Sequence, residues 1–132
     1  MLRYMLDTNI CILALKADVT SRIATYFNRF AEQLCISSIV LAELHYGAVN
    51  SKRVVENLSQ IEMFAARLEA ILVFDSSAAV EYGRLSASLR HQPIGPLDTL
   101  IAAHARSRGL VLVTGNVSEF ARVPGLEIEI WQ

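Results

Sequence analysis

The stretch Leu2-Arg3-Tyr4-Met5-Leu6-Asp7-Thr8-Asn9 decides the fold of this chain. It begins with a short apolar run and ends in a polar triplet, after which apolar residues return from Ile10 to Leu15. This pattern predicts a buried strand that ends at Asp7 and a helix that begins directly after it. Asp7 then has two interpretations. It caps the helix by accepting hydrogen bonds from free backbone N–H groups, or it belongs to a ligand site outside the carboxyl end of a strand in an open α/β sheet.

The composition indicates one globular domain over residues 1–132. Hydrophobic residues make up 53% of the chain, and the net charge of −1 neither favours nor excludes nucleic acid as a partner. No apolar run reaches the ~18 residues of a membrane span, and no signal peptide is recognisable. Cys11 and Cys35 lie in apolar runs without the spacing of a zinc site, so we expect buried free thiols in a cytoplasmic protein.

The rest of the chain alternates between helical and extended patterns. Helices are predicted over 18–33, 39–50, 51–70, 78–90 and 97–108, and strands over 34–37, 71–74, 110–114 and 127–131. The order of these elements predicts an α/β fold with a mostly parallel sheet. His104, within the apolar helix 97–108, is expected to be a core histidine rather than a ligand.

Four polar positions share one description. Asp7 and the turn with Asn116 and Glu119 each follow a strand, Glu43 lies among apolar residues early in its helix, and Asp98 lies in the first turn of its helix. Each acid also has an ordinary interpretation, as a helix cap, a dipole contact or a solvated side chain. If these chain segments converge, however, their carboxylates repel one another unless a cation lies between them.

Oxygen donors without accompanying cysteine or histidine favour Mg²⁺ or Mn²⁺ over zinc. Such an ion binds phosphates and activates water for in-line displacement at phosphorus. The chain carries no phosphate-binding glycine loop and no serine–histidine–aspartate arrangement. The residue chemistry alone therefore points to metal-dependent phosphoester chemistry.

Four segments resemble the PIN-domain ribonucleases and, more closely, the VapC toxins of bacterial VapBC toxin–antitoxin pairs. They are Met5-Leu6-Asp7-Thr8-Asn9, Ile36-Ser37-Ser38 with Ala42-Glu43-Leu44-His45-Tyr46-Gly47-Ala48, Gly95-Pro96-Leu97-Asp98-Thr99-Leu100-Ile101-Ala102, and Val113-Thr114-Gly115-Asn116-Val117-Ser118-Glu119-Phe120. Each motif alone is weak, but four in this order across almost the whole chain are specific.

The resemblance implies a three-layer α/β/α fold with about five strands and the activity of a Mg²⁺- or Mn²⁺-dependent endoribonuclease. Asp7, Glu43 and Asp98 match the family's acidic metal site. The fourth position is open between Asn116, where many PIN domains carry aspartate, and Glu119 one helical turn later. The hydroxyls that orient the acids in the family match Thr8 and Thr114.

The resemblance also implies partners. The family's inhibitor is a VapB antitoxin, its members are typically homodimers, and its substrates are structured RNAs. These are often tRNA and in some members initiator tRNA cut in the anticodon arm. Gly115 departs from the VapC pattern, which more usually carries asparagine there.

Three other functions stay open at this point. The chain is a PIN-like module that binds RNA or protein without catalysis, a metal-dependent phosphohydrolase acting on non-RNA phosphate esters, or an α/β interaction module whose acids are helix caps. The phosphohydrolase would cleave generic phosphoesters and need no RNA, and the interaction module would bind no divalent metal at the acids.

Overall fold

A computed structural model describes all 132 residues of the chain and contains one five-stranded sheet. Every strand pairs in parallel with its neighbours, in the order β3-β2-β1-β4-β5. The strands are β1 (Tyr4–Leu6), β2 (Leu34–Ser37), β3 (Ala70–Leu72), β4 (Val111–Val113) and β5 (Ile128–Glu129). The predicted α/β class and the parallel sheet are therefore confirmed.

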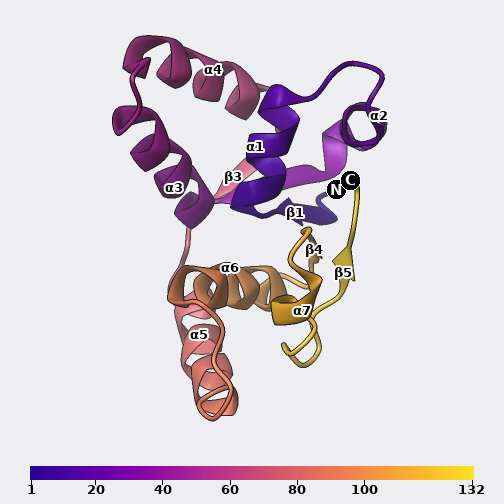
Figure 1. Cartoon of the computed structure of the whole chain (residues 1–132). Coiled ribbons are helices and arrows are strands. Elements are labelled where there is room, and N and C mark those ends of the chain that lie inside the picture. The colour runs from indigo at the N-terminus through magenta and orange to yellow at the C-terminus, as the bar shows by residue number, and fades with distance from the viewer.

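Helices cover both faces of the sheet (Figure 1). They form two groups on opposite sides, which confirms the three-layer α/β/α arrangement. The first group is α1 (Thr8–Lys16), α2 (Arg22–Arg29), α3 (Ser38–Val49) and α4 (Val54–Ala66), and the second is α5 (Ser76–Ser88), α6 (Pro96–Ser107) and α7 (Val117–Phe120). None of these helices is both long and apolar enough to cross a membrane.

Several elements are shorter than predicted, because side chains near their ends form turns instead. The helix predicted over 18–33 begins only at Arg22. Asp18 accepts hydrogen bonds from the backbone and side chain of Thr20, and Ser21 caps the helix by accepting from Ala24 N–H. It ends at Arg29 and is followed by a 3₁₀ turn over Ala31–Gln33. Short polar side chains compete with helix by such local bonds.

The helix predicted over 51–70 is likewise confined to α4, and Ala70 belongs to β3 rather than to the helix. The predicted strands 71–74, 110–114 and 127–131 shorten to β3, β4 and β5, and the polar turn after β4 contains the short helix α7. Trp131 is not part of the edge strand. It folds back onto the core and is fully buried.

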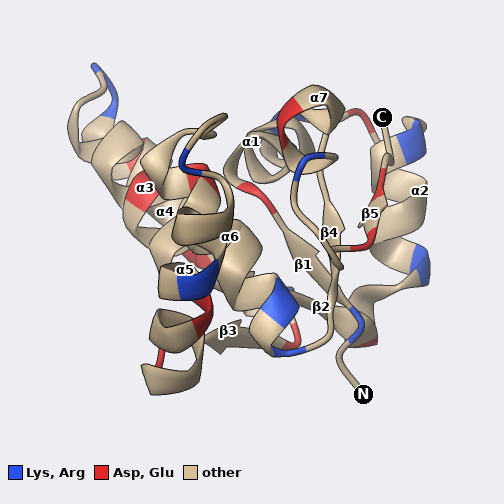
Figure 2. Cartoon of the chain, turned by 90° about the horizontal axis from the view of Figure 1, so that it is seen from below, with Lys and Arg blue, Asp and Glu red and all other residues tan.

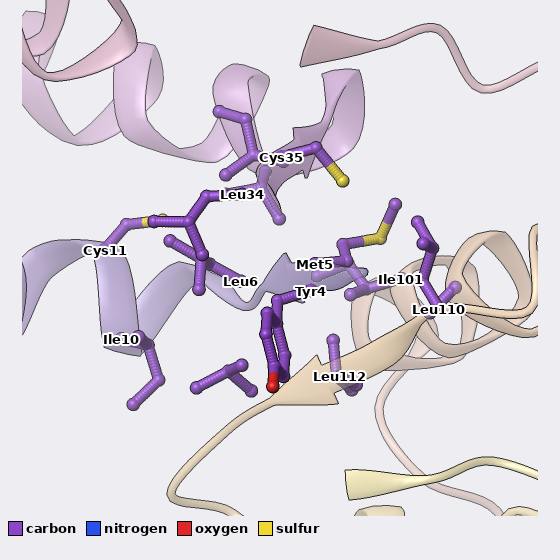
Figure 3. Close-up of a cluster of buried hydrophobic side chains, with 14 of the residues drawn as sticks. Tyr4, Met5, Leu6, Ile10, Cys11, Leu34, Cys35, Ile101, Leu110 and Leu112 are labelled. Carbon is purple, nitrogen blue, oxygen red and sulfur yellow. The ribbon is translucent and has the colours of Figure 1, made fainter. Parts of the chain in front are cut away.

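The core consists of the short inner strands and the apolar helix faces around them (Figure 3). All residues of β1, β2 and β4 are buried, as expected for strands covered by helices on both sides. Beside them Trp131 stacks on Tyr26, with ring centroids 5.2 Å apart and planes 11° apart, and also contacts Tyr4 and Phe30. The aromatic residues of α2 thus serve as core, as their spacing predicts.

The sheet order creates a switch point between β1 and β4. From β1 the chain builds outward to β2 and β3, and then returns to the other side of β1 to add β4 and β5. In such sheets the connections from the two central strands diverge and leave a crevice at their carboxyl ends. Leu6 pairs with Val113, so Asp7 and Thr114 follow at the same level on adjacent strands.

A buried histidine joins helix α6 to the sheet. His104 of α6 is fully buried, and its Nδ1 lies 2.8 Å from Ser37 Oγ at the end of β2. Ser37 Oγ also accepts a hydrogen bond from Ile39 N–H. No protein group accepts a hydrogen bond from His104 Nε2. His104 is a core residue, but its polar capacity is only half satisfied.

We expect His104 to make the protein less stable in acid. Burial lowers the pKa of His104, against a smaller opposing effect of the Asp75 charge. The unfolded chain therefore takes up a proton below pH ~6.5 that the folded chain takes up only at lower pH. The stability due to neutral His104 is complete above that pH and declines as the pH falls, by at most about 1.4 kcal/mol per pH unit. Urea denaturation of the wild type and of His104→Asn measures this. The difference in free energy of unfolding between them should shrink from pH 7.5 to 5.5, and a constant difference would contradict the assignment.

Candidate active site

Asp7 lies at the switch point and uses both carboxylate oxygens. Its Oδ1 accepts a 2.9 Å hydrogen bond from Ile10 N–H and caps α1, and its Oδ2 accepts a short hydrogen bond from the Thr114 hydroxyl. Only 4% of the residue is exposed. Asp7 is therefore both helix cap and crevice carboxylate, and the two interpretations of the sequence do not exclude each other.

Glu43 lies on a different element, one and a half turns into α3. Its Oε1 accepts a 2.7 Å hydrogen bond from the hydroxyl of Thr8, the residue after Asp7. This contact joins the first turn of α1 to α3 and turns the Glu43 carboxylate toward the crevice. Thr8 and Thr114, the two hydroxyls picked out by the resemblance, thus each hold one acid.

Asp98 and Glu119 form the other side of the site. Asp98 lies in the first turn of α6 beside Glu119 of α7, whose carboxyl group raises the pKa of Asp98. Glu119 Oε2 in turn accepts a 3.1 Å hydrogen bond from Asn116 Nδ2, and Asn116 N–H donates to Thr114 Oγ1. Asn116 therefore contacts Asp98 only through Glu119, which is the acid that meets the other carboxylates. The sequence alone does not choose between these two residues.

The charges of the four carboxylates interact with one another. Burial raises the pKa of Asp98 to about 6, with further contributions from the carboxyl group of Glu119 and then from Asp7 and Glu43. Burial also raises the pKa of Asp7; the Thr114 and Ile10 hydrogen bonds oppose this, and the Glu43 charge adds to it. Acids from segments centred near residues 7, 43, 98 and 119 thus converge, and Figure 2 shows acidic segments just after β1, in α3 and in α7.

No basic side chain neutralises this acidic site. The three ion pairs of the chain are Arg53–Glu56, Arg84–Glu81 and Arg106–Glu81, and none of them includes Asp7, Glu43, Asp98 or Glu119. A structural ion-pair network would place arginine or lysine here, because uncompensated buried charge is costly. The acidic site therefore has no positive partner within the chain.

The oxygen donors fit a hard divalent ion. No three of these acids stand close enough to enclose a metal by themselves. Mg²⁺ suits such an open arrangement, since it binds through one or two carboxylates and fills its other positions with water and phosphate oxygens. The way in which Asn116 acts could not be predicted from the sequence, because only the folded chain brings its amide to Glu119.

We expect Asp98→Asn to stabilise the metal-free protein at neutral pH. The pKa of Asp98 is about 6 in the folded chain and ~3.9 in an unfolded one. The folded state binds the extra proton between these values, so the Asp98 contribution to stability falls as the pH rises through this window. Asparagine carries no charge and avoids this loss. After allowance for solvent screening, the gain should be about 1 kcal/mol at pH 7.5 and should vanish near pH 4.

Thermal and urea denaturation in chelator at both pH values measures this gain. Glu62→Gln, at an exposed acid of α4 outside the site, is the control and should show no such pH-dependent gain. Equal stability of Asp98→Asn and wild type at pH 7.5 would show that the carboxylates do not repel one another.

Comparison with known proteins gives the family to which the chain belongs. The family model described as PIN domain matches residues 4–126. A tRNA(fMet)-specific endonuclease VapC from Salmonella typhimurium is 47% identical over 133 residues, covering 99% of each chain. The chain belongs to the PIN-domain family, among the VapC ribonucleases. Ribonuclease VapC2 of Haemophilus influenzae is 46% identical over 136 residues, again with 99% of each chain covered.

Solved structures of VapC proteins share the fold over their full length. The DNA-bound VapBC structure from Salmonella typhimurium superimposes with a TM-score of 0.94 at 47% identity and covers all of both chains. VapBC2 of Rickettsia felis, bound to a DNA fragment from its promoter, gives 0.91 at 38% identity, with 99% of this chain and 100% of that chain covered. The PIN-like fold and the VapC resemblance predicted from sequence are confirmed.

Proposed function

We propose that this VapC-family chain is a divalent-metal-dependent endoribonuclease that cleaves initiator tRNA and is inhibited by a VapB-type antitoxin. The observation that carries the metal-dependent chemistry is the convergence of four carboxylates without a basic partner at the β1–β4 switch point. The substrate is inferred from a relative at 47% identity that is named a tRNA(fMet)-specific endonuclease. The antitoxin is inferred from the VapBC assemblies of the structural relatives.

In the proposed mechanism Asp7 and Asp98 would hold the ion and Glu43 would bind it directly or through water, with Mg²⁺ or Mn²⁺ as the candidates. When bound, the ion neutralises charge on the scissile phosphate and lowers the pKa of water. Thr114 and Thr8 fix the Asp7 and Glu43 carboxylates by their hydrogen bonds, so these oxygens face the crevice before substrate arrives. Glu119, held by Asn116, places a further carboxylate beside Asp98 that is able to accept a proton from the attacking water.

RNA recognition fits a chain with little net charge. Exposed loops of structured RNA are read by shape, stacking and backbone contacts, so a few local arginines suffice.

We also propose that the chain forms a homodimer. This is supported by exposed apolar side chains such as Tyr46, Val49 and Val80. We propose a cytoplasmic location, which is supported by two free buried cysteines.

The test is cleavage of a total bacterial RNA pool by the purified chain, with Mg²⁺, with Mn²⁺ and with chelator. Transcripts of initiator and elongator methionine tRNA are run beside the pool. We expect one discrete cut, in initiator tRNA, that needs the metal and stops when a VapB-type antitoxin is added. Cleavage of bis(p-nitrophenyl) phosphate without any cut in RNA would instead indicate a general phosphohydrolase. Metal binding without either cleavage would indicate a silent binding module.

A further inference from the structure

A short turn after α7 contacts the chain at both ends of α6. Arg122, three residues beyond Glu119, donates from Nη1 to the carbonyl oxygens of Gln92 and Pro93, at 3.2 and 3.3 Å. These carbonyls lie in the loop that leads into α6. At the other end of α6, Arg106 donates from Nη1 to Pro124 O at 2.8 Å. Residues 122–124 therefore fasten both the entrance and the exit of the helix that carries Asp98.

The entrance of α6 is held by the burial of Ile94 in the core, but it has few hydrogen bonds to other elements. Gly95 is its N-cap and offers no side chain, and the loop contains two prolines, which cannot donate backbone hydrogen bonds. Thr99 bonds to Gly95 O within the same segment, so that contact does not tie the loop to another element. Arg122 supplies the cross-link to α7.

Arg122 and Glu119 lie one helical turn apart, and both reach the same segment. Glu119 meets Asp98, and Arg122 meets the chain five and six residues before Asp98. When both are ionised, the carboxylates of Asp98 and Glu119 repel one another, and an attractive contact nearby then helps to hold α7 against the loop. The Arg122 contact is attractive and lies between α7 and the loop. A guanidinium presents several donors in a fixed geometry, so one side chain binds both carbonyls.

We infer that Arg122 is a positioning residue of the acidic site: by clamping loop 92–96 to the turn after α7, it keeps Asp98 opposite Glu119. The consequence for metal binding rests on the proposed function, whereas the clamp itself is a property of the metal-free chain. A partly exposed arginine beside an RNase site would otherwise be taken for a phosphate contact, and the two roles predict different results.

The test compares Arg122→Ala, Arg122→Lys and the control Arg90→Ala. Arg90 is exposed and also donates from Nη1 to a carbonyl, that of Ala87, but this contact stays within its own helix end. Hydrogen exchange in the metal-free proteins is measured for the amides of residues 92–99, and Mn²⁺ affinity is measured without RNA. KM and kcat are measured with RNA at saturating Mn²⁺.

For Arg122→Ala we expect faster exchange at residues 92–99, an approximately 10-fold loss of Mn²⁺ affinity and a lower kcat with unchanged KM. Arg122→Lys should recover part of each effect, since an ammonium still donates to one carbonyl, and Arg90→Ala should change neither exchange nor Mn²⁺ affinity. Unchanged exchange in Arg122→Ala, or a higher KM as its only effect, overturns the clamp. If the wild type itself fails to bind Mn²⁺, the proposed metal site fails, and the exchange rates still decide on the clamp.

Discussion

Asp7→Asn should reduce RNA cleavage by about 10³-fold while Asp75→Asn leaves it unchanged. Both aspartates cap a helix through the same contact: Asp7 Oδ1 accepts from Ile10 N–H at 2.9 Å, and Asp75 Oδ1 accepts from Ala78 N–H at 3.0 Å. Asparagine keeps the acceptor for this bond and is an equally good N-cap. The two substitutions therefore match in helix capping and differ in the crevice, where only Asp7 lies.

The size of the expected loss follows from the role of the charge. A carboxylate that helps to hold the ion contributes several kcal/mol to the stabilisation of the transition state, and about 4 kcal/mol corresponds to about 10³ in rate. Initial rates of initiator tRNA cleavage at saturating Mg²⁺ measure the effect, with circular dichroism to verify the fold of both variants. Near wild-type rates for Asp7→Asn would leave Asp7 with the capping role alone.

Trp131→Ala should lower the free energy of unfolding by about 4 kcal/mol, the largest effect on stability that we expect from one side chain. Trp131 is completely buried, packs on Tyr4, Tyr26 and Phe30, and donates from Nε1 to Glu129 Oε1 at 3.0 Å. Alanine leaves a large cavity between α2 and the strands, since three aromatic neighbours cannot all close onto it. It also removes the ring stacking that adds to area burial.

Urea denaturation followed by far-ultraviolet circular dichroism measures this change, because Trp131 is the only tryptophan and its fluorescence is lost in the variant. The neighbouring Ile130→Ala is the control. Ile130 is 49% exposed and should cost well under 1 kcal/mol. A loss of less than about 2 kcal/mol for Trp131→Ala would mean that the aromatic cluster is loosely packed.

Much of the acidic site can be predicted from the sequence, because its residues occupy places with a physical meaning. Asp7 follows a strand, and Glu43 is a carboxylate among apolar residues of a helix, so both stand out from the pattern of neighbouring residues alone. The contacts between segments cannot be predicted in this way. Which of Asn116 and Glu119 meets Asp98 depends on where a four-residue helix directs its side chains. The catalytic roles of all these residues remain predictions.

The fold shows the same division. Hydrophobic periodicity locates every strand and all six longer helices, but the ends of the elements are set by single polar groups. Asp18 and Thr20 delay the start of α2 by a local turn, and no periodicity contains that information. Trp131 continues the alternation of the edge strand, yet burying its ring against Tyr26 outweighs further pairing with β4.

The hydrogen bond between Thr114 and Asp7 joins positions 107 residues apart, and Glu119 comes later still. A chain still being synthesised therefore has no complete acidic site: until β4 is made and enters the sheet beside β1, Asp7 lacks its hydroxyl partner and Asp98 lacks Glu119. Contacts between residues this far apart in sequence form late, because closing the long loop between them costs conformational entropy before the contacts stabilise the fold. For an RNase made among the RNAs of its own translation machinery, the order of folding delays activity until nearly the whole chain has emerged.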